Sequence, residues 1–130
     1  MAMGEKRTAQ QVASRLGMQE HPEGGYFKEA YRSNLTVPVG ESEGYGGPRS
    51  AGTAIYYLLE GKDHSRWHRI VSDEIWHFYL GAPIELFLLD QNNGLRKIVV
   101  GNDLEKGEHP QFVVPGGVWF AARPQERDGF

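Results

Sequence analysis

The residues most able to carry chemistry lie in one stretch, residues 61–81, which reads GKDHSRWHRIVSDEIWHFYLG. Within it, His64 and His68 precede an acidic pair, Asp73 and Glu74. Imidazole nitrogens and carboxylate oxygens can hold a metal ion or move a proton when both face one cavity. The stretch therefore predicts a metal site or an acid–base pair, provided that neighbouring strands bring these side chains together.

Side-chain alternation predicts which residues face that cavity. We expect strands over 64–71 and 74–80, joined by a turn at Ser72-Asp73. Successive side chains of a strand point to opposite faces. One face of the second strand then carries Glu74, Trp76, Phe78 and Leu80. His77 points outward, as a surface or interface histidine.

Glu74 lies on an apolar face, where an unpaired carboxylate is costly to bury, so it should meet a partner. If the two strands form an antiparallel pair, His68 lies close to Glu74. Two interpretations stay open. The pair is a functional site, or it is a buried hydrogen-bonded pair that only supports the fold.

The 130 residues have the composition of one globular domain, with 39% hydrophobic residues and a formal net charge of −3. Lys and Arg are scattered, which argues against a nucleic-acid partner. Cysteine is absent, which excludes disulfides and a thiol nucleophile. No apolar run reaches the roughly 20 residues that cross a bilayer, and the N-terminus lacks a secretory signal. We therefore expect a cytoplasmic protein without a membrane partner.

A short helix and a series of strands are predicted to position the site. Residues 8–16 read as the helix, because Thr8 and Gln11 form a capping box and Gly17 suits a left-handed stop. The glycine-rich stretch 34–52 predicts a long loop without structure of its own, either covering a cavity mouth or simply slack. The expected strands are 26–32, 53–60, 64–71, 74–80, 84–90, 96–100, 111–114 and 118–122, with a hairpin turn at 91–94. Short strands joined by tight turns indicate an all-β antiparallel barrel or jelly roll.

Three blocks of the sequence resemble the cupin superfamily. Residues 61–81 are similar to the first cupin motif, with Glu74 followed by Gly81, and PGGVWF at 115–120 is similar to the second. The blocks HPEGGYFKEAYRS, SRWHRIVSDEIWHFYLG and VPGGVWFAARP together resemble the cupin-5 subfamily, a domain of unknown function, over residues 8–124. The resemblance implies an antiparallel double-stranded β-helix, the cupin jelly-roll barrel, with a small-molecule pocket and usually a homodimer.

The superfamily contains metal-dependent oxygenases and isomerases, RmlC-like sugar-nucleotide epimerases that use no metal, and binding or storage proteins. Its fold alone therefore fixes no chemistry. Metal-binding cupins carry a His-x-His pair and a Glu in the first motif and another His in the second. Here Arg66 stands two residues before His68, and Phe120 takes the place of the second-motif histidine. The candidate metal ligands His64, His68 and Glu74 are an incomplete set for a divalent metal, and no cofactor is predicted.

The aromatic side chains instead predict an apolar pocket for an organic ligand. The first hypothesis is a barrel that binds an unidentified small organic molecule. Its ligand-binding candidates are Tyr57, Arg66, His68, Glu74, Trp76, Phe78 and Phe120. Arg66 can clamp a phosphate or carboxylate if it faces inward, whereas exposure at the barrel mouth is the other interpretation.

Three other hypotheses remain. The second is a metal-independent sugar epimerase or isomerase with His68 and Glu74 as catalytic residues, His68 being the general base and Tyr57 or Tyr26 the proton donor. The third is a metal-dependent oxygenase or isomerase. The fourth is a scaffold or storage module without a ligand.

We expect a single cupin domain over residues 8–124, an N-terminal tail over 1–7 and a C-terminal tail over 125–130. The resemblance predicts further strands after Pro124, so the chain appears shortened relative to the family. An open strand edge invites association, which makes a partner at that edge the expected consequence.

Overall fold

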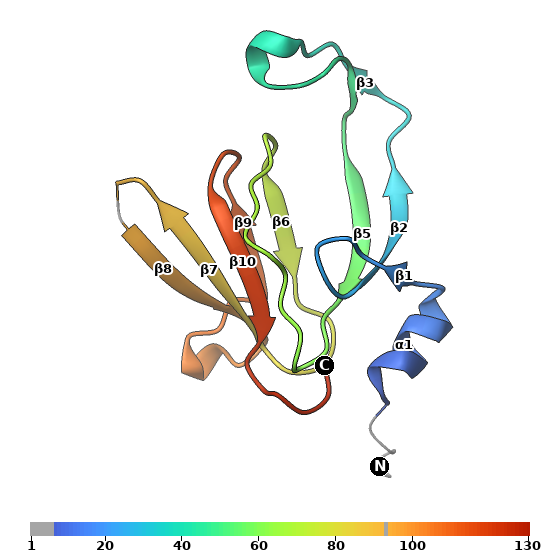
Figure 1. Ribbon diagram of the computed structural model, residues 1–130, viewed down its shortest axis with the longest axis vertical. Helices are drawn as coiled ribbons and strands as arrows, with labels where there is room; N and C mark the ends of the chain where they lie inside the picture. The colour runs from blue at the N-terminus through green and yellow to red at the C-terminus, as the bar shows by residue number, and fades with distance from the viewer. Residues whose placement is uncertain (1–6, 93) are drawn as a thin grey trace.

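The computed structural model describes residues 7–92 and 94–130, and it is built mostly of β-strands with one α-helix (Figure 1). The helix is α1 (Ala9–Leu16), and two short 3-10 helices cover Glu41–Glu43 and Leu104–Lys106. The strands are β1 (Gln19–Glu20), β2 (Tyr26–Arg32), β3 (Thr36–Val37), β4 (Arg49–Ser50), β5 (Thr53–Leu58), β6 (Glu74–His77), β7 (Ile84–Asp90), β8 (Gly94–Val100), β9 (Gln111–Val114) and β10 (Trp119–Pro124). Within these residues, no helix is of the length and apolar character needed to cross a bilayer.

Helix α1 forms where its capping residues predict it. The Thr8 side chain accepts a hydrogen bond from the Gln11 backbone N–H, and the Gln11 side chain accepts one from the Thr8 N–H. Gly17 ends the helix in the left-handed conformation, with φ of 67°. Ala9 and Val12 are buried against Leu58 of β5, so the helix packs on the sheet as expected.

The strands form four separate hydrogen-bonded sheets, with orders β1-β2-β5, β10-β7-β8, β3-β4 and β6-β9. All of these pairings are antiparallel. Within the described residues these ladders do not join into one closed barrel, which the resemblance had led us to expect. In Figure 1 the paired strands β2 and β5 rise beside the other strands, and β3 and the loop that contains the 3-10 helix Glu41–Glu43 lie beyond their upper ends.

The predicted strand over 64–71 is wrong. This segment has no regular secondary structure, and its one β-bridge joins His68 to Phe120 of β10. The buried Ser65 attaches the same segment to β10, because its N–H donates to the Ala122 carbonyl (2.8 Å) and its hydroxyl accepts from the Ala122 N–H (2.9 Å). The expected pairing of 64–71 with 74–80 is therefore also wrong, and β6 pairs instead with β9.

Other element boundaries differ from expectation. The predicted strand over 74–80 stops at His77, since Phe78 donates its backbone N–H to Pro110 outside any ladder. The stretch 34–52 is not structureless, because β3 and β4 pair within it. A register shift between Glu29 and Tyr31 interrupts the simple alternation of β2. The hairpin turn at 91–94 includes Asn93, which lies outside the described residues, while Gly94 has the expected positive φ of 71°.

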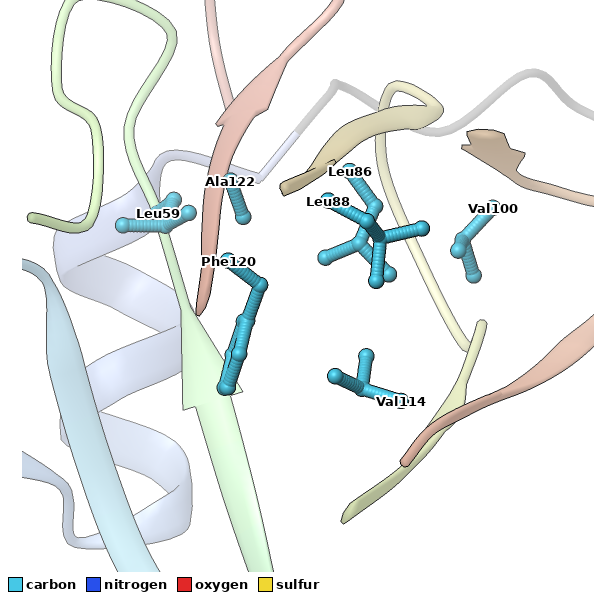
Figure 2. Packing of buried hydrophobic residues seen from close by; sticks show 7 residues of the cluster. All are labelled: Leu59, Leu86, Leu88, Val100, Val114, Phe120 and Ala122. Carbon is cyan, nitrogen blue, oxygen red and sulfur yellow. The ribbon is translucent and has the colours of Figure 1, made fainter. Parts of the chain in front are cut away.

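The main hydrophobic core lies between the β10-β7-β8 sheet and the β6-β9 pair. Figure 2 shows its buried members, which are Leu59, Leu86, Leu88, Val100, Val114, Phe120 and Ala122. Trp76 and Phe78 pack against this cluster from the side of β6. The core is therefore in contact with β6 through Trp76, and the candidate site lies on the same strand.

Candidate functional site

His68 is fixed in place by its backbone. Its N–H donates to the Phe120 carbonyl (3.0 Å), the Phe120 N–H donates to the His68 carbonyl (2.9 Å), and the two rings lie 4.3 Å apart between centroids. The ring Nδ1 lies 2.7 Å from the backbone oxygen of Arg66. Because a carbonyl oxygen can only accept, Nδ1 must carry a proton and donate. The neutral ring therefore keeps an unprotonated Nε2 that can accept a proton or a hydrogen bond.

Glu74 begins β6 and faces inward, as alternation predicted. Burial alternates along the strand: Glu74 and Trp76 are half-buried, whereas Ile75 and His77 are exposed. Burial raises the pKa of Glu74, while the indole of Trp76 and the nearby His68 lower it in part. Within the described part of the chain, no cationic side chain lies within ion-pair distance of its carboxylate.

The indole of Trp76 has an unsatisfied polar atom. Its Nε1 lies near enough to the Glu74 carboxylate to affect the pKa of that group, but the two do not meet hydrogen-bond geometry. Nε1 is therefore buried without a hydrogen-bond partner among the residues that the structure describes. Such a group is uncommon in a folded protein, because leaving a buried donor unpaired costs about 1–3 kcal/mol.

Tyr57 of β5 lies beside this pair. Its ring is 5.9 Å from the Trp76 ring and its hydroxyl donates to the Gly24 carbonyl (2.7 Å). Burial raises the pKa of Tyr57, and the negative charges of Glu74, Glu23 and Asp63 raise it further. The phenol is therefore a protonated donor at neutral pH.

His21 completes the group, although alternation gave no reason to expect it. The Glu23 N–H donates to its Nδ1 (2.9 Å), and its ring contacts that of Tyr57 at 5.3 Å. Burial lowers the pKa of His21, Glu23 opposes that effect, and the nearby His68 adds to it. The ring is accordingly neutral at pH 7 with its proton on Nε2. We call His21, Tyr57, His68, Glu74 and Trp76 the inner polar cluster.

A hollow of about 420 Å³ borders this cluster, and we call it the outer hollow. It is lined by residues 20–26 and by Lys62, Asp63, His64 and Arg66. His21 belongs to both, since it lines the hollow and contacts Tyr57. The exposed Arg66 and His64 thus lie at the hollow and not beside Glu74.

The structure therefore divides the predicted site residues. Tyr57, His68, Glu74 and Trp76 come together, whereas Phe120 is fully buried in the core beneath them and Phe78 packs against that core. The candidate metal ligands His64, His68 and Glu74 do not form a group that could hold a metal ion. Across residues 7–92 and 94–130, no three His, Asp or Glu side chains are placed to hold a metal ion.

The raised pKa of Glu74 makes a prediction for stability. A carboxyl group whose pKa is higher in the native than in the unfolded state binds more protons when folded, so stability falls as pH rises from the unfolded value through the native one. Glu74→Gln removes that dependence, and we expect a higher free energy of unfolding than the parent at pH 7. Urea denaturation from pH 4 to 8 measures the difference.

Glu85 supplies a matched control of opposite sign. Burial alone would raise the pKa of Glu85, but hydrogen bonds from Arg123 (2.8 Å) and Lys97 (3.2 Å) outweigh it and lower the pKa. Glu85→Gln should therefore reduce stability at pH 7, and the loss should shrink as pH falls through the native pKa. Equal losses at pH 7 in both variants would show that Glu74 is not destabilised by burial.

Comparison with known proteins matches this chain to one family, to a related sequence and to similar solved structures. The model of the Cupin_5 family, described as "Cupin superfamily (DUF985)", matches residues 10–130. The uncharacterized protein YML079W of Saccharomyces cerevisiae is 35% identical over 125 residues, which cover 87% of this chain and 59% of that protein. The chain thus spans less than two thirds of the length of this relative.

Two solved structures are also similar. A hypothetical protein from Leishmania major aligns with a TM-score of 0.80 and 35% identity, covering 90% of this chain and 70% of that one. Protein SO0799 from Shewanella oneidensis aligns with a TM-score of 0.83 and 30% identity, covering 95% of this chain and 73% of that one.

Proposed function

Because the chain belongs to the Cupin_5 family (DUF985) of the cupin superfamily, we propose that it binds a small organic molecule at the inner polar cluster. The observation that carries the proposal is the buried, unpartnered Nε1 of Trp76 beside the Glu74 carboxyl group. A bound ligand that accepts from the indole would remove the cost of the unpaired donor.

The chemistry of the cluster limits the class of ligand. Trp76 offers a donor and the Glu74 carboxylate offers acceptors, so a hydroxyl group can satisfy both by accepting from one and donating to the other. The rings of Tyr57 and Trp76 supply flat apolar surface beside these polar atoms. We therefore propose a hydroxylated molecule with an apolar or ring-shaped body, such as a sugar, a nucleoside or a hydroxylated aromatic acid.

A thermal-shift panel of sugars, nucleosides and aromatic acids tests the proposal. A ligand that binds only the folded state raises the melting temperature, and saturation at a hundred times Kd stabilises by about 2.7 kcal/mol. We expect at least one hydroxylated compound to raise Tm in the parent. Trp76→Phe, which keeps an aromatic ring but removes the N–H, should weaken that shift.

Trp67→Phe is the matched control, because Trp67 is exposed and outside the inner polar cluster. It should leave the ligand-induced shift unchanged. A panel without any shift, or a shift that survives Trp76→Phe intact, would contradict ligand binding at this site.

A second candidate function is proton transfer by His68, favoured by the hydrogen bond that leaves its Nε2 unprotonated. In this function His68 is the general base of a metal-independent epimerase or isomerase. The compounds that shift Tm can be followed by NMR for proton exchange with solvent. Exchange that is lost in His68→Gln and kept in the outward-facing His77→Gln would support the second function, and its absence with every binder would contradict it.

We also propose that the chain forms a homodimer through the upper part of the β2–β5 hairpin and the β3–β4 pair, called here the projecting arm (Figure 1). Tyr31, Leu35 and Val37 are exposed on it, and clustered exposed apolar side chains are typical of interfaces.

We expect sedimentation velocity to show a species of twice the chain mass. Leu35→Asp should convert it to monomer, whereas Leu104→Asp should not, although the two leucines are similarly exposed (72% and 68%). A parent that sediments as a monomer would contradict this proposal.

A further inference from the structure

A second hollow, of about 220 Å³, is bordered by the β7–β8 hairpin, by β9 and by the turn that joins β9 to β10. No residue that lines it belongs to the inner polar cluster, although Phe112 lies opposite Trp76 in the β6–β9 pair. We call this space the hairpin hollow. Its apolar lining includes Leu88, Phe112, Pro115 and Val118, and its two charged lining residues are Asp90 and Arg96.

Strand register places Arg96 on the core face of the β10-β7-β8 sheet. Phe120 of β10 lies opposite Leu88 of β7, and Leu88 lies opposite Arg96 of β8. Residues directly opposite each other on neighbouring antiparallel strands have their side chains on one face. Phe120 is 0% and Leu88 3% exposed, so this face is the one that builds the core (Figure 2). Farther along β8 it carries Ile98 and the buried Val100, and among the residues of these three strands Arg96 is its one cation.

Arg96 also differs from the other two cations of this sheet, which both have a partner. Arg123 and Lys97 bond to Glu85 at 2.8 and 3.2 Å. The guanidinium of Arg96, in contrast, makes no hydrogen bond, ion pair or cation–π contact with any residue that the structure describes. Its side chain is exposed at the hairpin hollow, so its N–H donors are available to a molecule bound there.

The charges at the hollow limit the class of ligand. An arginine fork matches the two oxygens of a carboxylate or phosphate. The Asp90 carboxylate accepts from the Asn92 N–H (2.9 Å) in the hairpin turn, and it also lines the hollow, where it would repel an anion. Arg96 can balance one negative charge, whereas a doubly charged phosphate ester would be repelled more strongly by Asp90. A single carboxylate therefore fits these charges best.

The size and apolar lining of the hollow define the rest of the ligand. At about 220 Å³ it is smaller than the roughly 300–1,000 Å³ of sites for drug-sized molecules, so it suits one ring or a short branched chain. We propose that the hairpin hollow binds a small organic monocarboxylate, with its carboxylate on Arg96 and its apolar body against Leu88, Phe112 and Val118. This site is separate from the inner polar cluster and does not depend on the ligand proposed there.

Benzoate is a suitable probe, because it combines one carboxylate with one apolar ring. The complete chain is titrated at pH 8 and constant ionic strength, and binding is followed by the amide signals in NMR spectra. Two probes of similar shape serve as controls. Benzamide has no charge, and phenyl phosphate carries two negative charges at this pH. The same titrations are made with Arg96→Gln and with Lys97→Gln, which removes an equal charge from the neighbouring residue on the opposite face.

We expect benzoate to shift the amide signals of Leu88, Arg96, Phe112 and Val118 until they saturate. Benzamide should bind the parent about tenfold more weakly or worse, since it loses the charge-assisted hydrogen bonds to the guanidinium, and phenyl phosphate should also bind more weakly than benzoate. Arg96→Gln should raise the Kd of benzoate by a similar factor, whereas Lys97→Gln should leave it unchanged.

Three results would each overturn the proposal: signals that do not saturate with benzoate, benzamide that binds as tightly as benzoate, or an equal loss of affinity in Arg96→Gln and Lys97→Gln. Trp76→Phe distinguishes the two sites, because it should weaken binding at the inner polar cluster and leave the Kd of benzoate unchanged. Benzoate binding that Trp76→Phe abolishes would assign the carboxylate to the inner polar cluster and would also overturn the proposal.

Discussion

Leu86→Ala is expected to lower the free energy of unfolding by about 2–5 kcal/mol, the range observed when a buried leucine is truncated in a well-packed core. Leu86 lies on β7 with no exposed surface and packs in the cluster that includes Phe120 and Val114 (Figure 2). Removing three carbon atoms there forfeits their transfer energy and leaves a cavity that sheets on both sides can fill only in part.

Leu89→Ala is the matched control, since the substitution and the strand are the same. Leu89 is 48% exposed, so its truncation loses less buried surface and leaves no closed cavity. Urea denaturation of both variants gives the two free-energy losses, and we expect a several-fold larger loss for Leu86. Similar losses would mean that the core does not lie between the β10-β7-β8 sheet and the β6-β9 pair.

The parts of the fold that sequence analysis predicted correctly depend on residues close together in the chain. The capping box of Thr8 and Gln11 joins residues three apart, and the structure contains it. β2, β7 and β9 have the predicted bounds, because β-branched and aromatic residues between turn signals are local features. Local patterns therefore located most of the strands.

Pairing between distant segments could not be predicted in the same way. The segment 64–71 has strand-like alternation, but its actual neighbour is β10, to which Ser65 and His68 bond. A turn at Ser72-Asp73 suggested the wrong partner, since nothing local distinguishes a hairpin from a crossover between sheets. In the structure the Asp73 carboxylate accepts from the Gly116 N–H instead (2.9 Å), which ties this turn to the one before β10.

The candidate site was predictable where alternation alone decided orientation. It placed Glu74 and Trp76 inward and His77 outward, and the structure agrees. It could not distinguish an aromatic ring that lines a cavity from one that fills the core, which is the position of Phe120. His21 was missed because it lies in a turn, although the two glycines after it, Gly24 and Gly25, were a signal of close backbone packing.

Gly25→Ala is expected to lower the free energy of unfolding by more than the conformational cost of alanine at a positive φ, because an added Cβ would also meet neighbouring atoms. Gly25 has φ of 79°, a left-handed value that costs a non-glycine residue about 1–2 kcal/mol. A Cβ atom at this position would in addition overlap the carbonyl oxygen of Leu58 and lie 2.9 Å from Leu59 Cδ2. The turn would have to shift, and the His21 N–H that donates to the Gly25 carbonyl (2.8 Å) would shift with it.

Gly107→Ala separates the two contributions, because Gly107 has the same φ of 79° and a Cβ there would meet no atom within 4 Å. We expect that variant to lose only the conformational part in urea denaturation, and Gly25→Ala to lose clearly more. Since the turn positions both His21 and the carbonyl that receives the Tyr57 hydroxyl, Gly25→Ala should also abolish any ligand-induced rise in Tm, whereas Gly107→Ala should preserve it. Equal losses of stability in the two variants would show that close packing of this turn on β5 does not hold the inner polar cluster in place.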